Sequence, residues 1–125
     1  MNKKILVLPI VMAVAALGLI SSTAQAGSDA TVSAACSSKG NFPPASYVTS
    51  IAAKGVSCAK ARQVVKAYHA CRKASGGASA KCNRRVLGFS CREGRRQSVP
   101  GVQYSVGVSC VKGSSKVNST YTQNV

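Results

Sequence analysis

The six cysteines constrain the fold of this chain more than any other feature of its sequence. An even number of cysteines in a short exported chain indicates a disulfide framework, here of three bonds. The sequence has no tryptophan, four tyrosines and two phenylalanines, so its hydrophobic core must be thin. Three closed loops, each stabilising by about 2–4 kcal/mol, would compensate for such a core. The cysteines are Cys36, Cys58, Cys71, Cys82, Cys91 and Cys110.

Residues 1–26 carry the three parts of a secretory signal peptide. A pair of lysines precedes an apolar stretch at residues 5–20, and residues 24–26 form the small-residue cleavage site Ala-Gln-Ala. As a helix, the apolar stretch would reach only about 24 Å, short of a hydrocarbon core of about 30 Å. We therefore predict cleavage after Ala26, a secreted protein (extracellular or in the cell envelope), and no membrane span after cleavage.

The remaining 99 of the 125 residues suit one domain with a modest core. Residues 27–45 are small and polar until a Phe-Pro-Pro sequence, which predicts a loose N-terminal arm held at Cys36. Residues 46–125 contain all the periodic segments and predict a disulfide-rich α+β domain.

A helix is predicted to begin at Cys58, where Ser57 suits the N-cap position, and to end before residues 75–77, Ser-Gly-Gly. Apolar residues recur at steps of three and four along one side of this helix. They are Ala61, Val64, Val65, Tyr68 and Cys71. The opposite, exposed side is predicted to carry Arg62, Lys66, His69 and Lys73.

After residue 77 the hydrophobic period changes from helical to two. Residues 85–92 and 102–110 alternate apolar and polar side chains, as half-buried strands do. Residues 116–122 predict a returning strand, and residues 47–51 a further short one. These elements predict an α+β fold, in which one helix packs on a small antiparallel sheet of three or four strands stapled by disulfides.

The segments GVSCAKARQVVKAYHACR, VLGFSC and YSVGVSCVKGSSKVNSTYTQ together resemble a group of small secreted cysteine-containing domains common in actinobacteria. In that group a capped V-S-C-x-x-A-R helix precedes a G-[FYW]-x-C strand and a final C-x-x-G hairpin. The resemblance covers residues 51–123. It implies a helix-on-sheet fold with a helix cysteine bonded to the last strand, and it implies no activity and no functional residues.

Six cysteines allow 15 connectivities, and their spacing alone leaves all of these open. Analogy with the group, together with the geometry of a helix on a sheet, favours Cys58–Cys110. Cys71–Cys82 would then close the Gly-Gly connection, and Cys36–Cys91 would hold the arm. Because no C-x-x-C sequence occurs, we interpret the cysteines as structural rather than redox-active.

Catalytic residues are scarce after residue 26, where His69, Asp29 and Glu93 are the only histidine and carboxylates. Their positions support neither a Ser-His-Asp arrangement nor a glycosidase pair. Pairing of the histidine with a lysine or glutamate, as in a ribonuclease, stays open. His69 and Cys71 lack the second ligand pair of a zinc site. We predict a protein that is no enzyme and binds no metal or cofactor.

The charge balance is the strongest compositional signal. After the signal peptide the chain contains 15 basic and two acidic residues, which gives a net charge of +13. Such a field attracts anionic polymers and lipid head groups, although high charge can also serve only solubility. Arginine suits bidentate contacts with phosphate. The predicted anion-binding residues are Arg62, Lys66, Lys73, Arg84, Arg85, Arg95 and Arg96.

The sequence favours an anionic cell-surface polymer or lipid head groups as the partner. It argues against specific nucleic-acid recognition, because the four tyrosines mostly fall on predicted core faces and would not be free to stack on bases. The alternative hypothesis is a small inhibitor or effector that binds one protein partner through the loop at residues 93–101.

Overall fold

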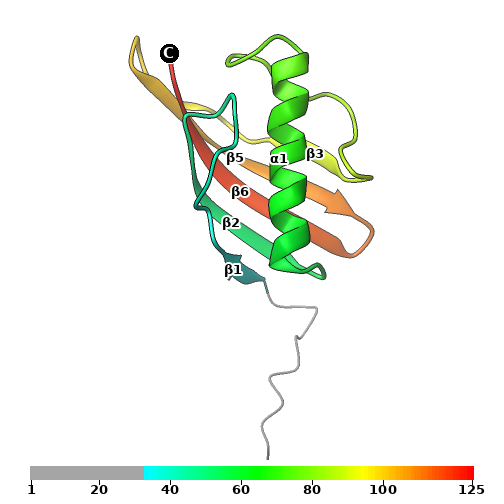
Figure 1. Ribbon diagram of the computed structural model, residues 1–125. Helices are drawn as coiled ribbons and strands as arrows, with labels where there is room; N and C mark the ends of the chain where they lie inside the picture. Colours follow the sequence, from blue (N-terminus) through cyan, green and yellow to red (C-terminus); the bar gives the residue numbers. More distant parts are fainter. Residues whose placement is uncertain (1–32) are drawn as a thin grey trace, which may run out of the picture.

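The computed structural model describes residues 33–125, in which one helix packs on an antiparallel sheet of six strands (Figure 1). The predicted signal peptide lies outside the described residues. The elements are β1 (Ala34–Cys36), β2 (Tyr47–Lys54), α1 (Cys58–Ala74), β3 (Ser90–Glu93), β4 (Gln97–Val99), β5 (Gln103–Lys112) and β6 (Ser115–Asn124).

The strands follow the order β1-β2-β6-β5-β3, and β4 pairs with β5 beyond the end of β3. The long β5–β6 hairpin forms the centre of the sheet, and its two-residue turn uses Gly113 at φ 58°. The predicted helix on an antiparallel sheet is confirmed, but the sheet has more strands than expected. Two of them, β1 and β4, are only three residues long, too short for alternation to reveal them. Because β1 pairs with β2, the ordered sheet begins within the predicted arm and before residue 46.

The helix begins as predicted, with the Ser57 hydroxyl accepting a hydrogen bond from the Lys60 amide at 3.1 Å. Its five predicted apolar positions are buried against the sheet. Arg72 and His69 are buried as well, so the prediction of an exposed His69 is wrong. The reason is that a second segment covers the helix, since the Phe42 ring lies 6.4 Å from the His69 ring. The buried arc is therefore wider than one apolar stripe.

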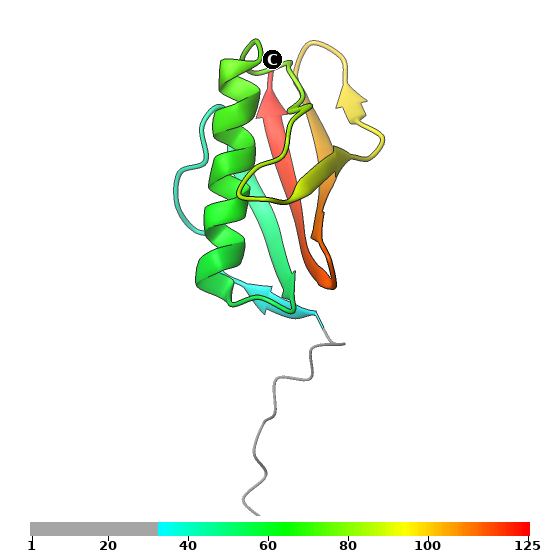
Figure 2. The ribbon, with the colours of Figure 1, turned by 90° about the vertical axis from the view of Figure 1, so that its right-hand side faces the viewer.

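The two faces of the sheet differ in chemistry. Side chains that face the helix form the core, and they include Val106, Val108 and Tyr121. The alternate positions carry small or polar side chains, such as Ser109, Asn118 and Thr120 of the two central strands. Figure 2 shows that α1 covers one face of the sheet and that no helix of residues 33–125 covers the other.

The disulfides are Cys36–Cys58, Cys71–Cys82 and Cys91–Cys110. Of the predicted pairs, only Cys71–Cys82 is formed. The predicted pairs Cys58–Cys110 and Cys36–Cys91 are wrong, and so is the helix-to-last-strand bond implied by the resemblance. The register explains the difference: Cys110 lies directly opposite Cys91 on the neighbouring strand, at a Cα–Cα distance of 4.0 Å. Strand β1 meanwhile brings Cys36 to the start of the helix.

A tight turn before β3 contains an unusual backbone conformation. Val86 and Phe89 exchange two backbone hydrogen bonds, of 3.0 and 2.8 Å, around Leu87 and Gly88. Both central residues have positive φ, 48° and 81°, as a type I′ turn requires. Among residues 33–125, Leu87 is the only residue other than glycine with positive φ. Asn-Gly is the preferred sequence for this turn, so leucine is a strained choice.

We expect Leu87→Asn to raise the free energy of unfolding by about 1 kcal/mol, because asparagine tolerates the left-handed conformation that costs leucine about 1–2 kcal/mol. Chemical denaturation of the oxidised protein measures the change. Leu87→Ala is the control, since it shortens the side chain but keeps the strained Cβ and should gain much less. A Leu87→Asn protein less stable than the wild type would contradict this account of the turn.

Candidate functional site

The side chain of Glu93 lies at the centre of a buried polar network between α1 and the sheet. It is 1% exposed, and its Oε1 accepts hydrogen bonds from the hydroxyls of Tyr68 at 2.8 Å and Tyr121 at 2.6 Å. Its Oε2 accepts a hydrogen bond of 3.0 Å from Nε of Arg96. Burial by itself would raise the pKa of Glu93, but these hydroxyls and the Arg96 charge outweigh it and lower the pKa. The carboxylate is therefore ionised and fully paired.

Arg72 is the second member of this network, and its side chain is completely buried. Its guanidinium donates to Nδ1 of His69 at 3.0 Å, to the Tyr104 hydroxyl at 2.9 Å and to the Ala80 carbonyl at 3.0 Å. The guanidinium also lies 4.2 Å from the centre of the Tyr121 ring. Sequence reasoning missed this residue. Its burial could have been predicted from a helical wheel, on which Arg72 lies one turn after Tyr68 on the apolar side.

His69 is held neutral inside the same network. Burial first, and then the Arg72 charge, lower the pKa of His69 to about 3. Because the Arg72 guanidinium donates to Nδ1, the ring proton lies on Nε2, which has no hydrogen-bond partner among the described residues and sits among aromatic rings. With no exposed surface, His69 cannot reach a substrate. It acts here as an acceptor that fixes Arg72.

The burial of neutral His69 predicts a stability that falls with acid. In the unfolded chain His69 binds a proton near pH 6.5, whereas in the folded chain it does so only near pH 3. Between these values the unfolded state holds more protons, so the free energy of unfolding should fall by up to about 1.4 kcal/mol per pH unit as pH decreases. Urea unfolding from pH 7 to pH 5.5, above the range in which Glu93 takes up a proton in the unfolded chain, measures this slope.

His69→Gln is the matched variant, because its amide oxygen can still accept from Arg72 but does not titrate. Its slope should be close to zero above about pH 5.5, where Glu93 is ionised in both the folded and the unfolded state. An unchanged slope in this variant would assign the acid sensitivity to another group.

The structure divides the seven predicted anion-binding residues into two groups. Arg62 and Arg96 are engaged within the protein: Arg62 donates to the backbone carbonyls of Ser37 and Lys39, and Arg96 to Glu93 and to the Ser79 carbonyl. The other five are exposed at the surface. They are Lys66, Lys73, Arg84, Arg85 and Arg95.

The neighbours Arg95 and Arg96 should therefore differ in their contribution to stability. We expect Arg96→Gln to lower the free energy of unfolding by about 2 kcal/mol, because it leaves the buried Glu93 carboxylate without its closest cation. Arg95→Gln, one residue earlier and exposed, is the control and should change it by less than about 0.5 kcal/mol. Equal effects in thermal or urea unfolding would mean that the Glu93–Arg96 pair carries no structural role.

Three of the exposed arginines line a common hollow of about 330 Å³ beside β3. Arg84 and Arg85 come from the loop after α1, and Arg92 comes from β3. None of these three guanidinium groups has a hydrogen bond or ion pair to another residue in the range 33–125. The remaining lining residues are Cys82, Asn83, Ser90 and Cys91.

Disulfides fix both walls of this arginine-lined hollow. Cys82 is bonded to the helix at Cys71, and Cys91 is bonded to the central strand at Cys110. The backbone that carries the arginines is therefore restrained on both sides, which lowers the entropy lost on binding. The sequence predicted Arg84 and Arg85 as anion-binding residues but not Arg92, because the hollow joins segments that lie apart in the sequence.

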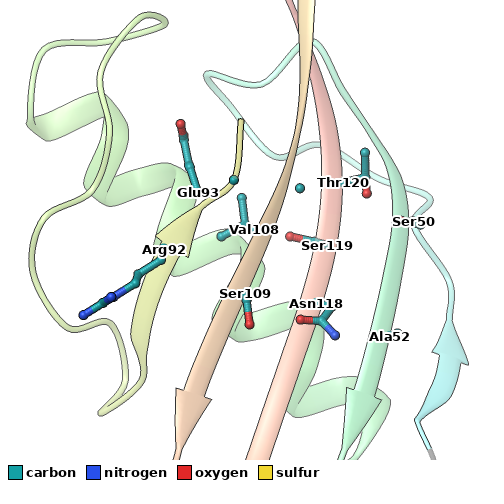
Figure 3. A pocket seen from close by; sticks show the side chains of 11 residues that line it. Ser50, Ala52, Arg92, Glu93, Val108, Ser109, Asn118, Ser119 and Thr120 are labelled. Atoms are coloured by element: carbon teal, nitrogen blue, oxygen red, sulfur yellow. The ribbon is translucent and has the colours of Figure 1, made fainter. Parts of the chain in front are cut away.

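A second depression, of about 460 Å³, lies on the helix-free face of the sheet (Figure 3). Its floor consists of small residues from β2, β5 and β6. In Figure 3 the side chain of Arg92 extends away from the central strands, toward the side on which the loop after α1 runs. Arg92 thus borders both depressions. The floor residues include Ser50, Ala52, Gly107, Ser109, Asn118 and Thr120.

Residues 33–125 contain no group of three histidine, cysteine or acidic side chains that could hold a metal ion. In the same part of the chain no helix is long and apolar enough to cross a membrane. No family model, curated protein or solved structure matches the chain. The three disulfides suggest an oxidising environment outside the cytoplasm.

Proposed function

We propose that this protein is a non-catalytic, secreted or cell-envelope-associated basic domain that binds an anionic surface or polymer by charge. The predicted signal peptide at residues 1–26, with cleavage after Ala26, would export it. The disulfides are compatible with that destination, since they persist in oxidising compartments.

The observation that carries this proposal is the burial of Glu93. It is the only acidic residue in the described range, and its side chain is 1% exposed and paired with arginine. Every charged side chain on the surface of residues 33–125 is therefore positive. The exposed cations are Lys39, Lys66, Lys73, Lys81, Arg84, Arg85, Arg92, Arg95, Lys112 and Lys116.

A surface with one sign of charge repels other cations and concentrates polyanions. The arginines of the hollow add geometry to this field, because free guanidinium groups can each make two parallel hydrogen bonds to a phosphate. Stacking on nucleic-acid bases has less support. Of the four tyrosines, Tyr68, Tyr104 and Tyr121 are buried, and only Tyr47 is exposed.

The non-catalytic part of the proposal is supported by the positions of His69 and Glu93. These are the residues from which an acid–base mechanism would be built in this chain, and both are enclosed between the helix and the sheet. Asp29 lies outside the described residues. A general acid or base must come within hydrogen-bond reach of the group it protonates or deprotonates, which these two side chains cannot do.

A second candidate function, binding of one protein partner, is favoured by the exposed valines around β4. Val99 and Val102, at the two sides of the β4–β5 turn, are 52% and 54% exposed. Apolar side chains at a protruding turn suit a protein contact. Within the predicted contact loop at residues 93–101, Glu93 belongs to the core, so only Gly94 onward could contribute. Binding of this kind would survive high salt.

We expect the oxidised protein to bind isolated cell envelope and other polyanions with a dissociation constant that rises steeply with salt, by about a hundredfold or more between roughly 50 and 200 mM. Arg84→Gln combined with Arg85→Gln should weaken binding at low salt and reduce the salt dependence, because two contacts with phosphate are lost. Gln63→Ala, an exposed uncharged change, is the control. Salt-insensitive binding would instead favour the protein partner.

A further inference from the structure

The strained turn at Leu87 presents an apolar side chain to solvent without contributing to the core. Leu87 is 47% exposed, whereas its neighbours Val86 and Phe89 are 6% and 1% exposed. The two buried residues fix the base of the turn and leave the leucine at its tip. A residue held in an unfavourable conformation, about half exposed and outside the hydrophobic core, indicates a function at that position.

Basic residues surround this tip. Arg84 and Arg85 precede it by three and two residues. On the other side, the Lys112 side chain lies so close to Gly88 that a Cβ there would meet it at 3.1 Å, and its Nζ lies 5.9 Å from the centre of the Phe89 ring. The cations thus flank the turn from two separate elements.

A second exposed apolar residue, Val111, lies on the neighbouring strand β5, where it is 43% exposed and pairs with Ser90 and with Lys116. Because side chains alternate along a strand, Val111 points to the helix-free face, whereas Lys112 shares the face of the buried Cys110. The turn before β3 and the β5–β6 turn both project from the right-hand edge of the molecule in Figure 1. The exposed Leu87 and the cations of Arg84, Arg85 and Lys112 therefore belong to the same edge of the molecule.

We propose that this edge docks on an anionic lipid bilayer, with Leu87 inserted among the head groups and the surrounding cations paired with lipid phosphates. The proposal rests on the proposed function and names the surface that is bound. Charge complementarity selects an anionic partner, and the apolar tip selects a bilayer, because a hydrated polymer or a nucleic-acid backbone offers charge but no apolar phase. Arg84, Arg85 and Arg92 would hold the phosphates, and Lys112 would hold the opposite side of the turn.

The absence of tryptophan from the sequence permits a direct test, because a single introduced tryptophan reports its own environment. We would place it at position 87, and at position 102 as a matched exposed site near β4, in the processed, disulfide-bonded protein. With phosphatidylglycerol vesicles, Leu87→Trp should show blue-shifted emission and quenching by brominated acyl chains, and Val102→Trp should show neither. Phosphatidylcholine vesicles should shift neither.

Leu87→Asn provides the complementary loss-of-function variant, because it suits the turn better and keeps every charge. We expect it to bind phosphatidylglycerol vesicles about tenfold more weakly than the wild type, while Val102→Asn binds as the wild type does. Folding failure cannot mimic this result, since Leu87→Asn is expected to be the more stable protein.

Two outcomes would overturn the docking proposal while leaving the proposed function intact. One is equal binding of Leu87→Asn and wild type, with no shift at position 87. The other is salt-sensitive binding to isolated wall polymer or nucleic acid with no binding to phosphatidylglycerol vesicles. Failure of the wild type to bind any polyanion at low salt would overturn both.

Discussion

The ionised Glu93 carboxylate, enclosed between the helix and the sheet, is the interaction on which the rest of this structure depends. It belongs to the edge strand β3. It accepts hydrogen bonds from hydroxyl groups of α1 and β6 and from a guanidinium group of the segment before β4. Arg72 of α1 lies 3.9 Å away and extends the network to the loop after the helix and to β5. The hydrophobic core is thin and built largely from alanine and valine, and its apolar contacts are not directional. The hydrogen bonds to Glu93 are directional, so each donor side chain has one position in which all these bonds form together.

The same network determines the electrostatics of the surface. Because the only acidic side chain of the described domain is turned inward, the outer surface retains positive charge alone. The arginines fall into two groups, which differ in their hydrogen-bond partners rather than in their place in the sequence. Arg62, Arg72 and Arg96 bind backbone carbonyls or the carboxylate, while the arginines of the hollow keep their hydrogen-bond donors free. The arginines that hold the structure and those proposed to bind anions are thus different members of one residue type.

The disulfides contribute by fixing the periphery. Each joins a short or irregular segment to a regular element: β1 to the helix start, the loop after α1 to the helix end, and β3 to the central strand. The two that flank the hollow also support the strained turn between them, where leucine occupies a conformation suited to asparagine or glycine. A rigid base allows such a turn to persist.

The sequence by itself determined the disulfide-stapled framework, the helix with its N-cap, the two central strands and the excess of positive charge. Each of these features follows from local spacing, from periodicity or from composition, which can be read without knowing any long-range contact. The strand predicted at residues 85–92 is wrong over most of its length, because residues 86–89 form a tight turn and β3 begins only at Ser90. The three-residue strands β1 and β4 could not be read in this way, because three residues carry too few alternations. Membership of the group of small secreted domains that the sequence resembles stays a hypothesis.

Only the tertiary structure decided which cysteines pair, which arginines are free and why His69 is buried. These depend on strand register and on segments far apart in the chain. Cys91 lies opposite Cys110 on the adjacent strand, and Phe42 covers part of the helix. Arg92 lines the same hollow as two arginines of the loop after α1. A helical wheel assigns one polar side, but a helix covered by both a sheet and a loop buries part of that side. Long-range contacts, which no local pattern specifies, therefore separate the residues that hold this protein together from those available to bind.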